Sequence, residues 1–295
     1  MATTVLSASL LGVQAVPIEV EVDLLNRLPA VCIVGLPASA VRESAERVRS
    51  ALESAGEEFP RKRVVINLAP ADLRKDGTAL DLPMALGVLA AAGRIPERAA
   101  RSVLAAGELS LDGRLRPVRG ALSLAVAARD VERVLVVPRE NAAQAAMVPG
   151  VTVWPADDLA QVVRWLTAEE DPPIASAPEA VASTASPDLA DVRGQHRARQ
   201  ALEIAAAGGH HLLLMGPPGC GKSMLARRLP SILPPLAFEG ALETSQVHSA
   251  AGLLPRGGVL RDRPFRAPHH TVTVAGLVGD RTLRPGEIAL AHNGV

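Results

Sequence analysis

The sequence contains no tyrosine, and its three phenylalanines and two tryptophans make up 2% of the 295 residues. A protein that binds single strands by stacking bases needs more aromatic side chains, so the composition argues against a stacking platform. Cysteine is equally scarce, because Cys32 and Cys220 are the only two. Their separation excludes a disulfide framework and a thiolate metal site, and it fits a reducing cytosol.

Long hydrophobic runs and an excess of one charge are also absent. The longest apolar run, residues 82–93, is too short to cross a bilayer, and the N-terminus lacks the basic segment of a signal peptide. We therefore expect a soluble, cytoplasmic protein without a membrane partner. Acidic and basic residues number 31 each, so any contact with DNA must come from a local patch.

The first half of the chain has the apolar patterns of a mixed α/β domain, which we place at residues 1–167. Alternating or continuous apolar segments predict strands at 4–11, 16–23, 30–34, 64–68 and 134–137. Helical spacing predicts helices at 39–55, with Ser39 as the cap, at 81–92, and from Gly120, Glu140 and Asp158. A hairpin is predicted over 102–118, turning at Asp112-Gly113.

Residues 168–187 are rich in proline, alanine, serine and glutamate, a composition typical of a flexible linker. The second domain then covers residues 188–295. Within it we predict helices through Ala207 and over 238–248, and the start of an apolar strand within 288–295.

A phosphate-binding loop is the strongest motif of the sequence. Residues 212–215 predict a buried strand and 224–229 a helix, and between them lies G-x-x-x-x-G-K-S. Its glycines allow backbone N–H groups to converge on an anion. Lys222 is expected to reach the β- and γ-phosphates of ATP, and Ser223 to ligate Mg²⁺. The expected nucleotide-binding residues of the loop are Gly216, Pro217, Pro218, Gly219, Cys220, Gly221, Lys222 and Ser223.

Several further motifs accompany this loop in a fixed order: DVRGQ, GPPGCGKS, HSAAGLLP, RPFRAPHHTV and RPGEIALAHNGV. Together they resemble the YifB/ComM-type, magnesium-chelatase-like AAA+ ATPases. The first half, with VGLPASAVRESAERVRSA, INLAPADLRKDG and GELSLDGRLRPVRG, is similar to the N-terminal domain of that family. The resemblance implies that this domain has the α/β fold of the Lon protease domain and ribosomal protein S5, followed by an AAA+ P-loop domain.

The resemblance also implies a function. It points to an ATPase that uses ATP and Mg²⁺, with Gln195 near the adenine, and that assembles into a homo-oligomeric ring, expected to be a hexamer. The best-described members of the family drive branch migration during recombination of incoming DNA in natural transformation. The expected partner is therefore DNA, either single-stranded or branched. Arg256, Arg261, Arg263 and Arg266 form a local basic run that could contact phosphates.

Members of the family continue past the counterpart of Val295 into a strand with an Asp-Glu pair that holds Mg²⁺ and activates water. That strand is missing from the sequence, so we expect a truncated, incomplete AAA+ domain without ATPase activity, and we assign no catalytic residue. The sheet order 5-1-4-3-2 implied by the resemblance places the neighbours of strand 212–215 after Val295, so this domain is expected to be unstable. A glycine run usual in the family is replaced by charged residues at 278–282.

Three alternative functions share features with this sequence. A peptidase is disfavoured because Ala79 and Leu122 occupy the places of the nucleophile and lysine of the Lon-like Ser–Lys dyad. ATP-driven metal insertion into a porphyrin is disfavoured because the chelatase subunit lacks the Lon-like domain. The third alternative is a non-catalytic fragment. Histidines 248, 269 and 270 lack accompanying carboxylates or thiols, which favours structural roles over a metal site.

Overall fold

The computed structural model describes residues 2–75, 77–178, 187–254, 259–280 and 284–295. The chain divides into two compact units, one formed by residues 1–178 with 249–256 and the other by 179–248 with 257–295. Among the described residues, no helix is long and apolar enough to cross a membrane.

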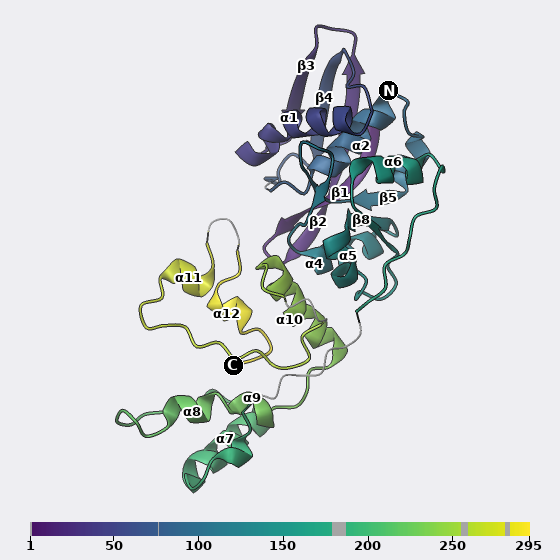
Figure 1. The fold of residues 1–295 in the computed structure, drawn as a ribbon. Coiled ribbons are helices and arrows are strands. Elements are labelled where there is room, and N and C mark those ends of the chain that lie inside the picture. Colours follow the sequence, from purple (N-terminus) through teal and green to yellow (C-terminus); the bar gives the residue numbers. More distant parts are fainter. Residues whose placement is uncertain (1, 76, 179–186, 255–258, 281–283) are drawn as a thin grey trace. The chain divides into compact units, whose positions relative to one another are not determined.

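The first unit is built on a seven-stranded mixed sheet with the order β3-β4-β2-β1-β5-β8-β9 (Figure 1). Antiparallel pairs join β1 to β2 and β2 to β4, and the other neighbours are parallel. The strands are β1 (Thr3–Leu11), β2 (Gln14–Leu25), β3 (Ala30–Val34), β4 (Arg63–Ala69), β5 (Val103–Ala105), β8 (Val134–Pro138) and β9 (Val153–Ala156).

The alternation in β2 explains how this sheet acquires a core face. Ile18, Val20 and Val22 are fully buried, whereas Glu19 between them is exposed. A period of two places these apolar side chains on one face of the strand, where the helices cover them. The five predicted strands are confirmed, although residues 30–34 form an edge strand that is only partly buried.

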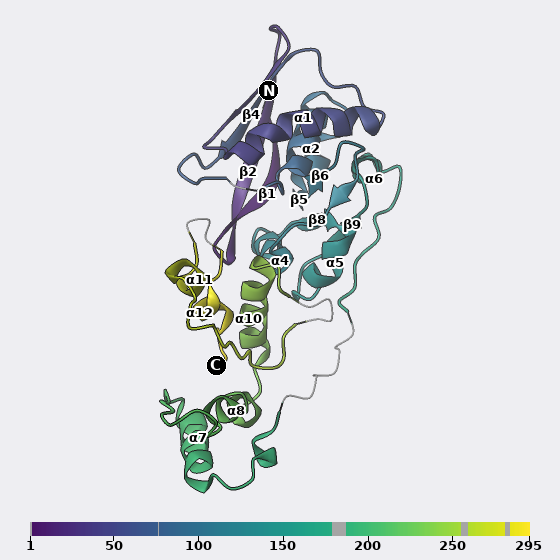
Figure 2. The same cartoon turned by 60° about the vertical axis from the view of Figure 1, so that its left-hand side comes forward.

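Six helices belong to the first unit: α1 (Ser39–Ser54), α2 (Asp81–Ala91), α3 (Glu97–Arg101), α4 (Ala121–Asp130), α5 (Arg139–Ala145) and α6 (Leu159–Leu166). Helix α2 packs on β1 and β2, and α1 packs on α2 (Figure 2). Gly87 permits the close approach of α2, because a Cβ at this position would lie 2.6 Å from Cγ2 of Val22. This glycine is required by packing and not by its backbone angles.

Three local predictions for this unit need correction. Residue Ala38, and not Ser39, is the N-cap of α1, and no side chain caps that helix. The predicted hairpin is shorter than expected: β6 (Glu108–Leu109) pairs with β7 (Leu115–Arg116), while residues 103–105 join the large sheet as β5. Strand β9 was not predicted, because its sequence VWPA is short and contains a proline.

A buried carboxylate connects α1, α2 and β6. The Asp81 side chain, which has no exposed surface, accepts hydrogen bonds from Nε of Arg47 at 2.8 Å, from the Ser44 hydroxyl, and from the Leu109 backbone N–H at 3.2 Å. Burial raises the pKa of the Asp81 carboxyl above its ordinary value, although the bonds from Arg47 and Ser44 act against this. Arg47 therefore keeps a costly buried charge compensated.

The second unit contains no strand among its described residues. It consists of the 3₁₀ turn η1 (Leu189–Asp191) and helices α7 (His196–Gly208), α8 (Lys222–Ala226), α9 (Leu229–Ile232), α10 (Phe238–Ala250), α11 (Val274–Val278) and α12 (Glu287–Leu290). Part of α10 belongs to the first unit. A small core of four buried residues, Leu189, Val192, Leu202 and Leu225, is surrounded by partly buried Leu212 and Leu214.

Two predicted strands of this unit are wrong. Residues 212–215 form no strand, because an extended segment needs a hydrogen-bonded neighbour and none is present in the described part of the chain. The segment keeps the alternation of a strand, with Leu213 and Met215 each 82% exposed. Residues 287–290 form helix α12, where a strand had been expected to begin.

The predicted linker and charged loop lie partly outside the described residues. Residues 168–178 are grouped with the first unit, and the Ala175 N–H donates to the carbonyl of Val153 at 2.9 Å. Residues 179–186 are not described, and neither are 281–283 of the charged stretch. The linker over 168–187 therefore stays a prediction.

We predict that limited proteolysis separates the two units. The first has a large continuous core, whereas the core cluster described beside the unpaired apolar segment of the second holds four buried residues. Segments with few buried contacts open and are cut first. Thermolysin should leave a resistant fragment ending near Leu166 at the end of α6, identified by mass spectrometry. Equal protection of residues 188–295 would contradict this.

We predict that Arg47→Met makes the stability of the first unit strongly pH-dependent. Without the guanidinium the pKa of buried Asp81 rises further, so the folded state holds a proton that the unfolded chain releases. Stability is then greatest below the unfolded-state pKa of about 3.9 and falls as the pH rises through the folded-state value. At neutral pH the loss should reach about 3 kcal/mol.

Urea unfolding followed by tryptophan fluorescence measures this effect, because Trp154 and Trp165 both lie in the first unit. The matched control is Arg42→Met, on the same helix, since Arg42 is exposed and its side chain bonds to no described residue. Parallel pH curves for the two variants would rule out the proposed role of Arg47.

Candidate nucleotide-binding site

The candidate site is the loop of residues 216–223, which connects the extended segment 212–215 to α8. Gly219 and Gly221 adopt φ values of +83° and +87°, in the left-handed region that favours glycine. Gly221 is the N-cap of α8, and the first bond of that helix runs from the Leu225 N–H to the Gly221 carbonyl at 2.9 Å. The N–H groups of Lys222 and Ser223 precede this bond and are free to face an anion.

Lys222 bends back over the loop that precedes it. Its ammonium group donates to the carbonyls of Gly216 and Pro217, each at 2.8 Å, and lies 3.6 Å from Sγ of Cys220. These neutral carbonyls hold the positive charge at the loop. A phosphate group is a stronger acceptor and would attract the same ammonium.

Gln195 reaches the loop from a position 25 residues earlier in the chain. It is the N-cap of α7 with φ +54°, and its Nε2 donates to the carbonyl of Cys220 at 3.1 Å. A Cβ at Gly221 would lie 3.6 Å from the same nitrogen. The structure therefore brings Gln195 to the loop, whereas its place beside the adenine stays a prediction.

The donor set fits a magnesium-bound nucleotide. It combines a lysine ammonium, free N–H groups at a helix start, and the Ser223 hydroxyl, which bonds to no other described residue. In this loop Pro217, Pro218 and Cys220 contribute backbone groups, and Lys222 and Ser223 contribute the side chains that would contact the ligand. These residues would hold the phosphates and the Mg²⁺ ion.

The basic run is largely engaged in internal contacts of the second unit. Arg266 makes a double hydrogen bond with Glu287, both at 2.7 Å, and Arg263 donates to the carbonyls of Pro234 and Asn293. Arg261 is exposed, and Arg256 lies outside the described residues. Internal contacts therefore engage Arg263 and Arg266, and a phosphate contact by this run stays a prediction.

These contacts bring together two motifs. The sequence showed their order along the chain but did not predict that they are in contact. The backbone of the RPFRAPHH motif pairs with the end of AHNGV, because the Arg266 N–H donates to Val295 O at 2.7 Å and the Val295 N–H donates to Pro264 O at 2.8 Å. The opposite charges of Arg266 and Glu287 were the available signal for this pairing. Their separation by 21 residues of irregular chain concealed it.

Backbone and neighbouring side chains contact His248, His269 and His270. Nε2 of His248 lies 3.1 Å from the Leu290 carbonyl, and burial lowers the pKa of this imidazole. The rings of His269 and His270 lie 4.1 Å apart, and Nδ1 of His269 contacts the Thr271 hydroxyl. No group of three or more metal-ligating side chains occurs among the residues that the structure describes.

The peptidase positions hold no reactive pair. Leu122 is fully buried in the core, and Ala79 carries no nucleophile. The neighbouring Thr78 hydroxyl donates to the carboxylate of Glu108, which is not a base paired with a lysine. Buried Lys75 donates to the Pro70 carbonyl, and desolvation lowers the pKa of its amine.

Two family models match this chain. The model described as magnesium chelatase, subunit ChlI, matches residues 188–295, and the model described as subunit ChlI of Mg-chelatase matches residues 20–141. The first match contains the phosphate-binding loop. The second covers most of the sheet of the first unit.

Curated relatives align with almost the whole chain. YifB of Salmonella typhimurium is 44% identical over 286 residues, covering 97% of this chain and 56% of the relative. YifB of Escherichia coli is 43% identical with the same shares. Competence protein ComM of Haemophilus influenzae is 42% identical over 299 residues, covering 99% of this chain and 58% of ComM.

The chain thus spans 56–58% of the length of these relatives. Its two matched regions, its G-x-x-x-x-G-K-S loop and its alignment with these relatives over 97–99% of its length agree in one assignment. The chain belongs to the YifB/ComM family of magnesium-chelatase-like AAA+ proteins, with a ChlI-like α/β domain followed by a region that matches the magnesium chelatase model.

Proposed function

We propose that the loop of residues 216–223 binds ATP with Mg²⁺, and that the protein uses ATP hydrolysis to drive a mechanical step. The observation that carries the proposal is the Lys222 ammonium, held at the loop beside the free N–H groups of a helix start. Lys222 would contact the β- and γ-phosphates, and Ser223 would ligate Mg²⁺. Gln195 would support the loop through Cys220.

The substrate that we propose is DNA, single-stranded or branched, moved through a homo-oligomeric ring that we expect to be hexameric. The name of the competence protein ComM supports this, because competence concerns uptake of DNA and the alignment covers 99% of the present chain. ATP-driven metal chelation remains the alternative, which the descriptions of the two family models favour. The YifB and ComM relatives, aligned over both matched regions, favour the DNA-processing function.

The first unit serves in this proposal as a binding or assembly domain and not as a peptidase. Its counterparts of the Lon-like dyad are Ala79 and buried Leu122, so no hydroxyl has a lysine to activate it. We place the protein in the cytoplasm.

We predict that Lys222→Ala weakens nucleotide binding by at least about tenfold, because a charge-assisted contact to the phosphates is lost. Binding of a fluorescent ATP analogue with Mg²⁺ to the chain of residues 1–295 measures this. We expect weak binding by the unmodified chain, since segment 212–215 has no strand neighbour in the described residues to hold the loop. The control Lys62→Ala removes an exposed lysine of the first unit and should bind as the unmodified chain does.

ATP turnover is tested in a chimera in which residues 1–295 are followed by the C-terminal part of the Escherichia coli YifB relative. DNA should stimulate hydrolysis by the chimera, and Lys222→Ala should abolish it. Equal turnover with and without Lys222 would overturn the assignment of the loop, and stimulation by a porphyrin but not by DNA would favour chelation.

We predict no proteolysis by the chain, because Thr78 is bonded to a carboxylate and no lysine lies in the position of a general base. Casein and fluorogenic peptides are the substrates to test. Cleavage that survives repurification and is lost in Thr78→Ala would contradict this expectation.

A further inference from the structure

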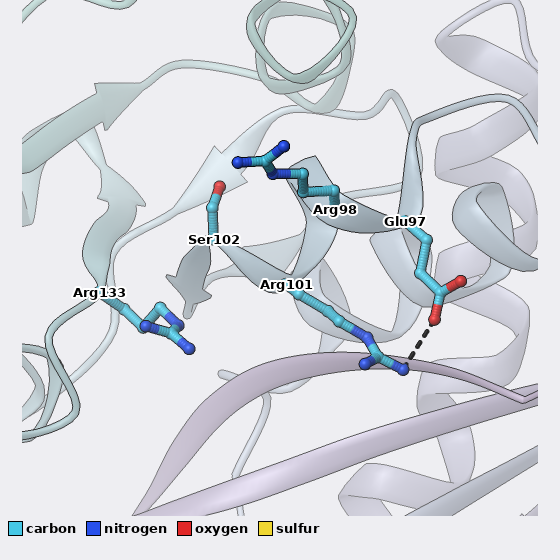
Figure 3. Close-up of a pocket in the computed structure, with 5 residues that line it drawn as sticks. All are labelled: Glu97, Arg98, Arg101, Ser102 and Arg133. Atoms are coloured by element: carbon cyan, nitrogen blue, oxygen red, sulfur yellow. Dashed lines mark ion pairs between the residues drawn. The ribbon is translucent and has the colours of Figure 1, made fainter.

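A basic pocket lies in the first unit, in the α/β domain and apart from the phosphate-binding loop. It has a volume of about 510 Å³ and is lined by Glu97, Arg98, Arg101, Ser102 and Arg133 (Figure 3). Four of these residues come from α3 and its C-cap, and Arg133 directly precedes β8. Neither of the proposed functions of the loop uses them.

The sheet fixes the two sides of this pocket relative to each other. Strands β5 and β8 are parallel neighbours with Val103 opposite Val134. The residues just before them, Ser102 and Arg133, therefore lie side by side at the same edge of the sheet. Arg98 and Arg101 are held one helical turn apart on α3, which packs on β1 and β5. The pocket is thus formed by α3 with its C-cap and by the turn that leads into β8.

The positive charge of the pocket is only partly compensated. Nη2 of Arg101 pairs with Oε1 of Glu97 at 2.7 Å. Nη1 of Arg133 contacts only backbone carbonyls, those of Glu132 at 3.2 Å and Val131 at 3.5 Å. Arg98 makes no hydrogen bond or ion pair with any described residue. The lining thus contains three guanidinium groups and one carboxylate, whereas the formal net charge of the whole chain is zero.

The remaining polar group of the pocket is the hydroxyl of Ser102. It donates its one proton to the Ala99 carbonyl at 2.7 Å, and it can donate to a phosphate oxygen instead when it rotates away from that carbonyl. Figure 3 shows this hydroxyl between the side chains of Arg98 and Arg133. Guanidinium groups present planar forks of N–H donors that match the oxygens of a phosphate better than an ammonium does.

We propose that this pocket is a phosphate-binding site of the first unit, formed by Arg98, Arg133 and Ser102, with Arg101 recruited from its pair with Glu97. The ligand is a phosphate group, carried either by the backbone of a nucleic-acid strand or by a small phosphate compound. The pocket shares no residue with the loop of residues 216–223, so the two sites can be tested by separate substitutions.

The test uses the chain of residues 1–295 carrying Lys222→Ala, so that the loop contributes little. The pocket variant is Arg98→Gln with Arg133→Gln. The matched control is Arg42→Gln with Arg116→Gln, which removes two exposed arginines of the same unit whose side chains bond to no described residue. One probe is a fluorescent single-stranded oligonucleotide, measured by anisotropy over a range of salt concentrations. The other is inorganic phosphate, followed by the NMR signals of arginine Nε–H groups.

If the phosphate belongs to a nucleic-acid strand, the pocket variant should bind the oligonucleotide about tenfold more weakly than the control. The negative slope of log K against log salt should become shallower by about 1.4 in the pocket variant relative to the control, at about 0.7 for each of the two lost contacts. If it belongs to a small compound, only the phosphate-induced NMR shifts should disappear in the pocket variant. Identical behaviour of pocket and control variants with both probes overturns the proposal.

Tryptophan fluorescence during thermal unfolding verifies that the variants remain folded. If the pocket variant is less stable, the single substitution Arg98→Gln decides the question, because this side chain contacts no described residue by a hydrogen bond or ion pair. Loss of binding in that variant supports the site, and unchanged binding with both probes overturns it.

Discussion

Strand pairing is the constraint on which both units of this chain depend. In the first unit β1, β2, β4, β5 and β8 each have a neighbour on both sides, and their apolar faces are covered by helices such as α2. In the second unit residues 212–215 have the sequence of a strand but no neighbour among the described residues. Unpaired backbone and two exposed apolar side chains, Leu213 and Met215, are the result.

The same constraint affects the candidate nucleotide site. The loop glycines and the Lys222 ammonium have the arrangement expected of a phosphate cradle, and Gln195 supports it through Cys220. A cradle binds tightly when its geometry is held before the ligand arrives, and a strand fixed within a sheet usually supplies that support. Here the support comes from Leu212 and Leu214, which pack on a small helical core.

In the first unit a buried ionic network adds to strand pairing. The Asp81 carboxylate connects α1, α2 and β6, because it accepts hydrogen bonds from Arg47, Ser44 and the Leu109 N–H. With these partners it is not available as a base for a peptidase-like site. A basic pocket, at Arg98 and Arg133, lies where β5 and β8 begin. Both arginines are exposed, so neither belongs to the buried core of the sheet.

The sequence alone predicted most strands and helices of the first unit, and it located the candidate nucleotide-binding loop. Alternation in residues 16–23 specified β2, and G-x-x-x-x-G-K-S specified the loop, because both signals are encoded over a few neighbouring residues. Only the tertiary structure decided that 212–215 stays unpaired, that Arg266 binds Glu287, and that Arg133 joins Arg98. These outcomes depend on which distant segments meet, and strand order and register are set by packing across the whole unit rather than by local sequence.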